Sequence, residues 1–177
     1  KELAEAPVDK KAQAAAKRKA TMQRKAEAKE WFEKAEKHRK NAEQKDAYQS
    51  YLKAAELGHA EAQYRLGECY SKGTGVKESL EEAFKWYRLA AEQGYVDAIG
   101  CLGYCYVEGE GLKQNREEGF RLLRQAAEKG DTDSRWFLGY CYKYGRGVTR
   151  NYTEAFKWFS RNEYSGFSPA ALESKFE

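Results

Sequence analysis

None of the side chains in this chain of 177 residues that could catalyse a reaction or bind a metal stands in a motif typical of either. The histidines, His38 and His59, lie far apart and no Cys-x-x-Cys pair accompanies them, so a zinc site is not indicated. No Ser or Cys has a histidine placed by a recognisable motif, although nucleophilic catalysis needs such a base. The acidic pair Glu81-Glu82 stands where a helix is expected to start, a position favoured by the helix dipole. We therefore expect no catalytic residue, no metal and no cofactor.

Three of the four cysteines, Cys69, Cys105 and Cys141, are spaced 36 residues apart. This placement is typical of a small apolar core residue, and equivalent positions in neighbouring helix pairs lie beyond disulfide reach. Cys101 stands one helical turn before Cys105, a spacing that seldom forms a disulfide in an intact helix. Unpaired cysteines slightly favour a reducing, cytoplasmic compartment over the periplasm or secretion. The first residues, Lys1–Glu5, are not a secretory signal.

The cysteines belong to a repeat in which a Leu-Gly-x-Cys-Tyr run is followed by a Gly-x-Gly pair. The glycine pairs lack the preceding strand, the third glycine and the Lys-Ser/Thr of a phosphate-binding loop, so we interpret them as helix ends. The runs begin at Leu66, Leu102 and Leu138, and the glycine pairs are Gly73 and Gly75, Gly109 and Gly111, and Gly145 and Gly147.

Each repeat predicts two helices. In the first helix, Ala62, Leu66, Cys69 and Tyr70 share one buried face. The second helix begins with a capping box, in which Ser or Asn is followed three residues later by Glu. Because one tyrosine recurs unchanged in every first helix, we assign it to the core. The capping residues are Ser79, Asn115 and Asn151, and the tyrosines are Tyr70, Tyr106 and Tyr142.

This pattern, Ala-x-x-x-Leu-Gly-x-x-Tyr-x-x-Gly-x-Gly-Val and then Ala-x-x-Trp-x-x-x-Ala-Ala-x-x-Gly, resembles the Sel-one-like repeat, a variant of the tetratricopeptide repeat. Residues 62–98 match in full, whereas Leu122 and Gly119 replace the Trp and Ala of the next repeat. The resemblance covers about 47–170. It implies an all-α fold, a superhelix (solenoid) of helix-turn-helix repeats. Some secreted members join the two helices of a repeat through cysteines, but the second helices here contain none.

We divide the chain into a basic Ala/Lys/Glu-rich segment, 1–44, and a repeat solenoid, 45–177. Within the solenoid we expect a half-repeat at 47–61, repeats at 62–97, 98–133 and 134–169, and a short C-terminal capping helix at 168–177. Residues from about Asp9 to Asn41 predict a long helix, with Trp31, Ala35, His38 and Ala42 on one face. Its distal end is expected to dock on the first repeat, and the part up to Met22 to project.

The side of each first helix that faces away from the core is the candidate binding surface. Positions 64, 68 and 72 and their equivalents vary between repeats, and in tetratricopeptide-type arrays this face lines a concave groove that binds peptides. An aromatic run with Arg135 and Arg146 at its rim is suited to recognition. Alternatively, the aromatic side chains pack under the C-terminal helix or against a neighbouring helix. The expected partner-binding residues are Tyr64, Glu68, Lys72, Tyr104, Glu108, Trp136, Tyr140 and Tyr144, with Gly100 at the remaining position.

These features indicate a non-catalytic adaptor or scaffold that binds a partner protein or peptide in its concave groove. One alternative is a structural protein that forms homo-oligomers through residues 1–44. A weaker one is nucleic-acid association, because residues 1–46 hold fourteen Lys or Arg against nine Asp or Glu. No aromatic residue is interleaved with the basic run at 10–25 for base stacking, so nucleic acid is not favoured. No apolar stretch approaches the roughly 20 residues of a membrane span, so we expect no integral membrane association.

Overall fold

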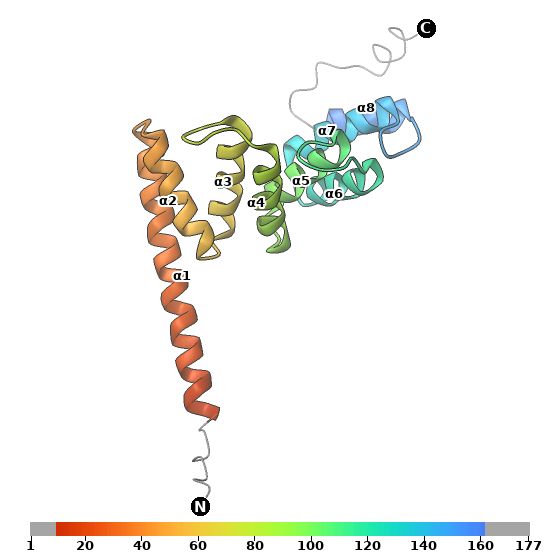
Figure 1. Cartoon of the computed structure of the whole chain (residues 1–177). Helices are drawn as coiled ribbons and strands as arrows, with labels where there is room; N and C mark the ends of the chain where they lie inside the picture. The colour runs from red at the N-terminus through yellow and green to blue at the C-terminus, as the bar shows by residue number, and fades with distance from the viewer. Residues whose placement is uncertain (1–9, 162–177) are drawn as a thin grey trace, which may run out of the picture.

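The computed structural model describes residues 10–161, which form helices joined by short turns, with no β-strand in that range (Figure 1). Successive helices pack as antiparallel pairs, and each pair packs on the next. The helices are α1 (Lys10–Lys40), α2 (Gln44–Glu56), α3 (Ala60–Lys72), α4 (Leu80–Glu92), α5 (Val96–Glu108), α6 (Arg116–Glu128), α7 (Thr132–Tyr144) and α8 (Tyr152–Ser160). The expected cap at 168–177 lies outside the described residues.

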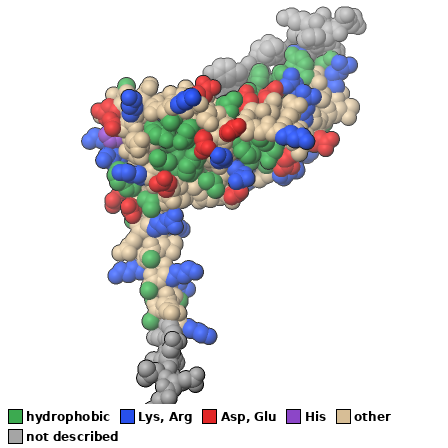
Figure 2. Space-filling model, in the orientation of Figure 1, with side chains coloured by type: hydrophobic (Ala, Val, Ile, Leu, Met, Phe, Trp, Pro, Cys, Tyr) green, Lys and Arg blue, Asp and Glu red, His purple; other side chains and the backbone are tan. Residues whose placement is uncertain are grey.

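The long helix α1 has a docked part and a projecting part, as expected from the sequence. Ala28 and Ala35 are buried against the first repeats, and the Arg24 guanidinium donates a hydrogen bond to the Glu56 carbonyl at 3.0 Å. Before Arg24, every described side chain is exposed, and blue Lys and Arg side chains stand out along this part (Figure 2). The sequence placed Ala42 on the docking face, which is wrong: Ala42 is exposed in the turn after α1, with φ of +60°.

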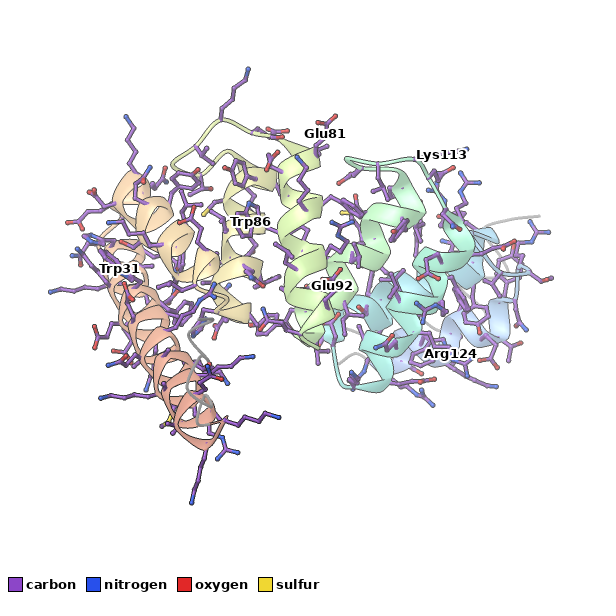
Figure 3. All side chains as sticks on the ribbon, turned by 60° about the horizontal axis from the view of Figure 1, so that its bottom comes forward. Trp31, Glu81, Trp86, Glu92, Lys113 and Arg124 are labelled. Atoms are coloured by element: carbon purple, nitrogen blue, oxygen red, sulfur yellow. The ribbon has the colours of Figure 1, made fainter. Side chains whose placement is uncertain are left out.

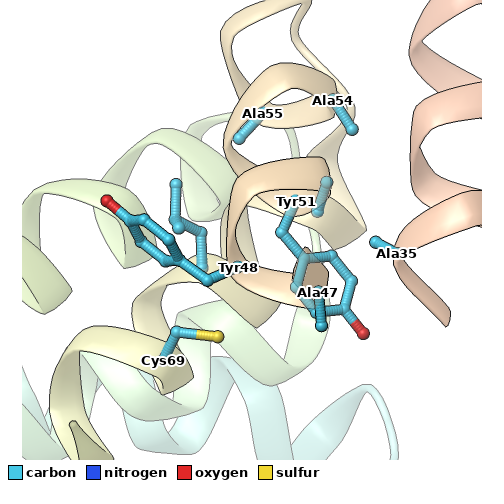
Figure 4. Packing of buried hydrophobic residues seen from close by; sticks show 9 residues of the cluster. Ala35, Ala47, Tyr48, Tyr51, Ala54, Ala55 and Cys69 are labelled. Atoms are coloured by element: carbon cyan, nitrogen blue, oxygen red, sulfur yellow. The ribbon is translucent and has the colours of Figure 1, made fainter. Parts of the chain in front are cut away.

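A hydrophobic cluster joins α1, α2 and α3 (Figure 4). Ala35, Ala54 and Leu66 are each fully buried in it, and the hydroxyl of Tyr51 donates a hydrogen bond to Glu36. Trp31 of α1 and Trp86 of α4 also pack against this cluster (Figure 3). The core therefore continues from one helix pair to the next, as a solenoid requires.

The second helix of each repeat starts with the predicted cap. The Asn115 side chain accepts a hydrogen bond from the Glu118 N–H at 3.2 Å, and Ser79 and Asn151 do the same in their repeats. In a complete capping box the Glu side chain also accepts a hydrogen bond from the backbone N–H of the capping residue. Here the Asn115 N–H donates instead to the Tyr106 carbonyl at 2.9 Å. The Glu118 carboxylate is thus left to pair with Arg121. The cap consequently ties each second helix to the end of the first.

Two contacts recur at the junctions between repeats. A ring of one second helix meets the recurring tyrosine of the next first helix edge to face, as Phe84 meets Tyr106 with centroids 5.6 Å apart. The second glycine of each pair lies against the first turn of the preceding second helix. A methyl group on Gly111 would stand 2.3 Å from the Leu80 carbonyl oxygen, and Gly75 and Gly147 are equally crowded. The recurring tyrosines are thus half-buried between repeats rather than deep in the core.

Candidate protein-binding surface

The first helices of the repeats, α3, α5 and α7, form one face of the array, which we call the inner face. α5 contacts α7 directly, although α6 lies between them in the sequence. A cavity of about 400 Å³ also opens on this face, with walls from all three helices. Three of the positions singled out in the sequence, Tyr64, Gly100 and Tyr104, line this cavity. None of the described helices is both long enough and apolar enough to cross a bilayer.

Three side chains at one-turn spacing on α7, Trp136, Tyr140 and Tyr144, form what we call the aromatic cluster. The Trp136 and Tyr140 rings stack with centroids 5.9 Å apart, and the Tyr140 and Tyr144 rings lie 4.7 Å apart. Trp136 also leans on Phe137 and Phe159. Even so, Trp136 remains 45% exposed and Tyr144 49% exposed. Phe137 and Phe159 therefore support one side of the cluster, and its other side is open to solvent.

An ion pair borders the aromatic cluster. Arg146 Nη1 lies 2.7 and 2.6 Å from the two carboxylate oxygens of Glu108, and its guanidinium stands 5.0 Å from the centre of the Tyr140 ring. This arrangement links α5 to the turn after α7. Arg135, the other expected rim residue, is not at this rim: its Nε donates to the Ala127 carbonyl of α6. A single step along a helix turns a side chain by about 100°, which carries Arg135 away from the face of Trp136.

The remaining predicted site residues lie apart from the aromatic cluster. Tyr64 is half-buried, with its ring 5.3 Å from that of Tyr95. Glu68 pairs with Lys72 at 2.7 Å and with Arg65 at 2.9 Å, which makes a charged strip along α3.

Tyr104 lies between the two groups. Its ring is 4.8 Å from that of Phe137, and its hydroxyl donates to Glu110 at 3.0 Å. Burial and this hydrogen bond raise the pKa of Tyr104 to about 12, so the phenol is neutral. The structure therefore brings Trp136, Tyr140, Tyr144 and Glu108 together, but not the whole predicted set.

The cavity on the inner face was not predicted from the sequence. It lies over Gly100, where the equivalent positions carry Tyr64 and Trp136, and the start of α7 forms one of its walls. Its acidic residues include Asp97 and Asp133. The sequence does contain a signal for them, because the acids Glu61, Asp97 and Asp133 recur every 36 residues.

The cysteines are unpaired thiols, of which Cys69, Cys105 and Cys141 are buried and Cys101 is partly buried. Burial raises the pKa of Cys69 to about 11 and those of Cys105 and Cys141 to about 12. Burial also raises the pKa of Cys101, which lines the cavity. A protonated thiol is a poor nucleophile, so these side chains serve packing rather than reaction at neutral pH.

Both histidines have structural partners. The His38 ring nitrogen lies 2.5 Å from the Glu43 carboxylate, with Asp46 close by at the exposed turn between α1 and α2. His59 is the N-cap of α3: its ring accepts a hydrogen bond from the Ala62 N–H at 3.2 Å and stacks on Phe32. Burial lowers the pKa of His59, which favours the neutral ring that this cap requires.

The Sel1 repeat model matches this chain at residues 24–38, 39–59, 60–95, 102–131 and 132–161. The chain belongs to the Sel1 repeat family. The match begins where the docked part of α1 begins, and the resemblance noted in the sequence is confirmed. Sel1 repeat proteins generally mediate protein–protein interactions and are typically non-enzymatic scaffolds.

Two solved structures of Sel1-type repeats are similar to this chain. A Sel1 repeat protein from Oxalobacter formigenes is 43% identical, with a TM-score of 0.61, over 66% of this chain and 46% of its own length. The protective antigen c5321, present in uropathogenic Escherichia coli strains and displaying an SLR fold, is 33% identical, with a TM-score of 0.72, over 88% of this chain and 33% of its own. The chain thus spans less than half the length of either protein. No curated protein sequence matches it.

Proposed function

We propose that this chain is a non-catalytic adaptor that binds a segment of a partner protein on its inner face, with the aromatic cluster as the anchor. The observation that supports this proposal is the solvent exposure of the aromatic cluster. Only four large hydrophobic side chains are exposed in residues 10–161, and two of them, Trp136 and Tyr144, flank Tyr140 on one helix. Large, rigid aromatic side chains that are open to solvent beside a polar rim have the character of binding hot spots.

The side chains of the aromatic cluster are also ordered before a ligand binds. Stacking on Tyr140 and support from Phe137 restrict the Trp136 ring before any partner arrives. Side chains that are already ordered lose less conformational entropy on binding, so more of the contact energy is available as affinity. The Arg146–Glu108 pair at the border supplies charges that can select among partners without adding much affinity.

The test is to pan a displayed random-peptide library against the full chain and to measure the affinity of the enriched peptides. Trp136→Ala/Tyr140→Ala should weaken binding by at least about 30-fold, since truncation of a hot spot costs about 2 kcal/mol or more. Leu89→Ala is the matched control, because Leu89 is an exposed hydrophobic residue on α4, outside the inner face. Circular dichroism of each variant should show unchanged helix content.

Each outcome of this experiment is decisive. A shared motif that binds the control and not the double variant supports the proposal. The absence of any enriched peptide would overturn it. Enriched peptides that bind the double variant as tightly as the parent would place the binding surface elsewhere on the array.

A second candidate function is self-association through the projecting part of α1. Ala14, Ala15 and Met22 line one side of this part, and Met22 is 72% exposed. Residues 10–26 contain basic residues and no acidic ones, however, and like charges oppose parallel pairing. Removal of residues 1–22 would leave the docked part intact, and light scattering would then report any fall in mass. An unchanged monomeric mass in both forms would exclude this candidate.

A further inference from the structure

The cavity over Gly100, which we call the Gly100 pocket, combines aromatic walls with an acidic rim. Its aromatic walls are Tyr64, Tyr104 and Phe137, one from each of the three first helices. Its volume of about 400 Å³ lies near the lower end of the range of ligand pockets, about 300–1,000 Å³. A space of this size suits a single long side chain rather than a folded element.

Its acidic residues have no cationic partner in the described part of the chain. Asp97, Asp131 and Asp133 line the pocket, and no ion pair found in residues 10–161 includes any of them. Arg65, the nearby cation, is already paired with Glu68 and Glu61. Partial burial and the neighbouring Asp131 carboxylate raise the pKa of Asp97. Within residues 10–161 no ion pair therefore neutralises the carboxylates of the pocket, although Arg65 acts on Asp97 from a distance and the Ser134 N–H donates a hydrogen bond to Asp131 at 2.8 Å.

The side of the pocket between α5 and α7 contains a buried hydroxyl that lacks a partner. Ser134 is 1% exposed, and its Oγ has no hydrogen-bond partner within residues 10–161. A methyl group at Gly100 would lie 2.5 Å from this oxygen, so glycine is what allows α7 to approach α5 here. An unsatisfied buried hydroxyl is costly and rare in folded proteins, and it therefore calls for an explanation.

We propose that the Gly100 pocket receives a lysine or arginine side chain of the partner segment that lies along the aromatic cluster. This inference rests on the proposed function and specifies the chemistry of its ligand. A cationic head group would pair with the three carboxylates, and its aliphatic stem would lie against the aromatic walls. An N–H donor on the ligand would supply the missing partner of Ser134 Oγ.

The pocket and the aromatic cluster are continuous through Phe137. The Phe137 ring lies 5.2 Å from that of Trp136 on one side and 4.8 Å from that of Tyr104 on the other. A peptide anchored on Trp136 and Tyr140 would therefore pass the mouth of the pocket within a few residues. We expect the binding motif to be an aromatic or aliphatic residue with a basic residue nearby in the sequence.

The direct test uses the isolated side chain as a probe, so that it does not depend on finding a peptide. The ¹⁵N-labelled full chain is titrated with N-acetyl-arginine N-methylamide, with the lysine equivalent, and with the uncharged citrulline equivalent. The two cationic probes should produce saturable shifts of the amide signals of Gly100, Cys101 and Ser134, and the citrulline probe should not. Equal shifts with all three probes, or shifts confined to other residues, would overturn the inference.

A charge-neutralising variant and a matched control then identify the groups responsible. Asp97→Asn/Asp133→Asn should weaken binding of the arginine probe by about tenfold, as expected for the loss of charged hydrogen-bonding partners. Glu81→Gln/Glu117→Gln removes the same number of charges from the same first-turn positions of α4 and α6, outside the pocket, and should leave binding unchanged. Equal weakening in both variants would show a long-range charge effect and refute a specific pocket.

Enriched peptides separate this inference from the proposed function. Replacing the basic residue of such a peptide by citrulline or glutamine should weaken binding about tenfold, and should have no further effect on the Asp97→Asn/Asp133→Asn variant. Peptides that bind the aromatic cluster equally well without a basic residue would refute the pocket and leave the adaptor function standing.

Discussion

The contact of Gly111 with the preceding repeat gives the sharpest test of how the array is held together. Gly111 has φ of +75°, and a Cβ atom built on it would lie 2.3 Å from the Leu80 carbonyl oxygen and 2.6 Å from the carbonyl carbon. Leu80 is the first residue of α4, and backbone at a helix start cannot move aside as a flexible side chain can. Gly111→Ala should therefore force the two repeats apart.

The magnitude follows from two separable costs. An L-residue in the left-handed region costs about 1–2 kcal/mol. Gly94 has φ of +83° with no atom within 4 Å of a built Cβ, so Gly94→Ala carries this cost alone. Gly111→Ala adds the cost of forcing atoms into a packed contact, about 1–3 kcal/mol. We thus expect a loss of about 2–5 kcal/mol for Gly111→Ala, against about 1–2 kcal/mol for Gly94→Ala.

Urea unfolding followed by circular dichroism would measure both free energies. Because each repeat contacts mainly its neighbours, a broken junction should also broaden the transition as the two sides unfold separately. Gly109→Ala is a second control in the same turn, since a Cβ atom built on Gly109 would lie no closer than 3.2 Å to any neighbour, the Cβ of Gln114. Equal losses for Gly111→Ala and Gly94→Ala would refute the role assigned to the junction.

Three further predictions concern single sites. The pKa of His59 is lowered by burial, so the unfolded chain binds its proton first and the free energy of unfolding should fall as the pH drops below about 6.5. His59→Asn, which keeps a capping oxygen that does not titrate, should flatten this slope in urea titrations across that range. Asn115→Ala should cost about 1 kcal/mol in thermal or urea unfolding, whereas Asn115→Ser should be nearly neutral, as the cap of Glu118 requires. Leu123→Ala should cost about 2–5 kcal/mol, because Leu123 is 1% exposed between α5 and α7; a loss below about 1 kcal/mol would contradict that packing.

The fold could be predicted from the sequence because its determinants are local and repeated. Ser79, Asn115 and Asn151 mark helix starts, and the first glycine of each pair marks a helix end, so the boundaries follow from nearby residues. The hydrogen bond from the Asn115 N–H to the Tyr106 carbonyl could not be predicted in this way. It depends on where the end of one helix meets the start of the next.

The binding surface was harder to predict than the fold. Helical spacing identified Trp136, Tyr140 and Tyr144 as a group, because residues four apart on a helix are neighbours. It did not show that Tyr104 turns toward Phe137, which depends on the packing of α5 on α7. The Gly100 pocket was missed for a related reason: a cavity is defined by the side chains around a gap, and a glycine in a sequence shows only that one side chain is absent.

The recurring junction has a consequence for how such proteins change in length. The ring contact and the glycine contact recur with the same spacing wherever two repeats meet. Duplication of any 36-residue stretch within the array would therefore create a new junction of the same kind without disturbing its neighbours. Positions such as Trp136 and Tyr140 lie outside these junction contacts, so a duplicated unit starts with a copied surface that is free to diverge. The number of units and the preference for a ligand can consequently evolve as independent traits.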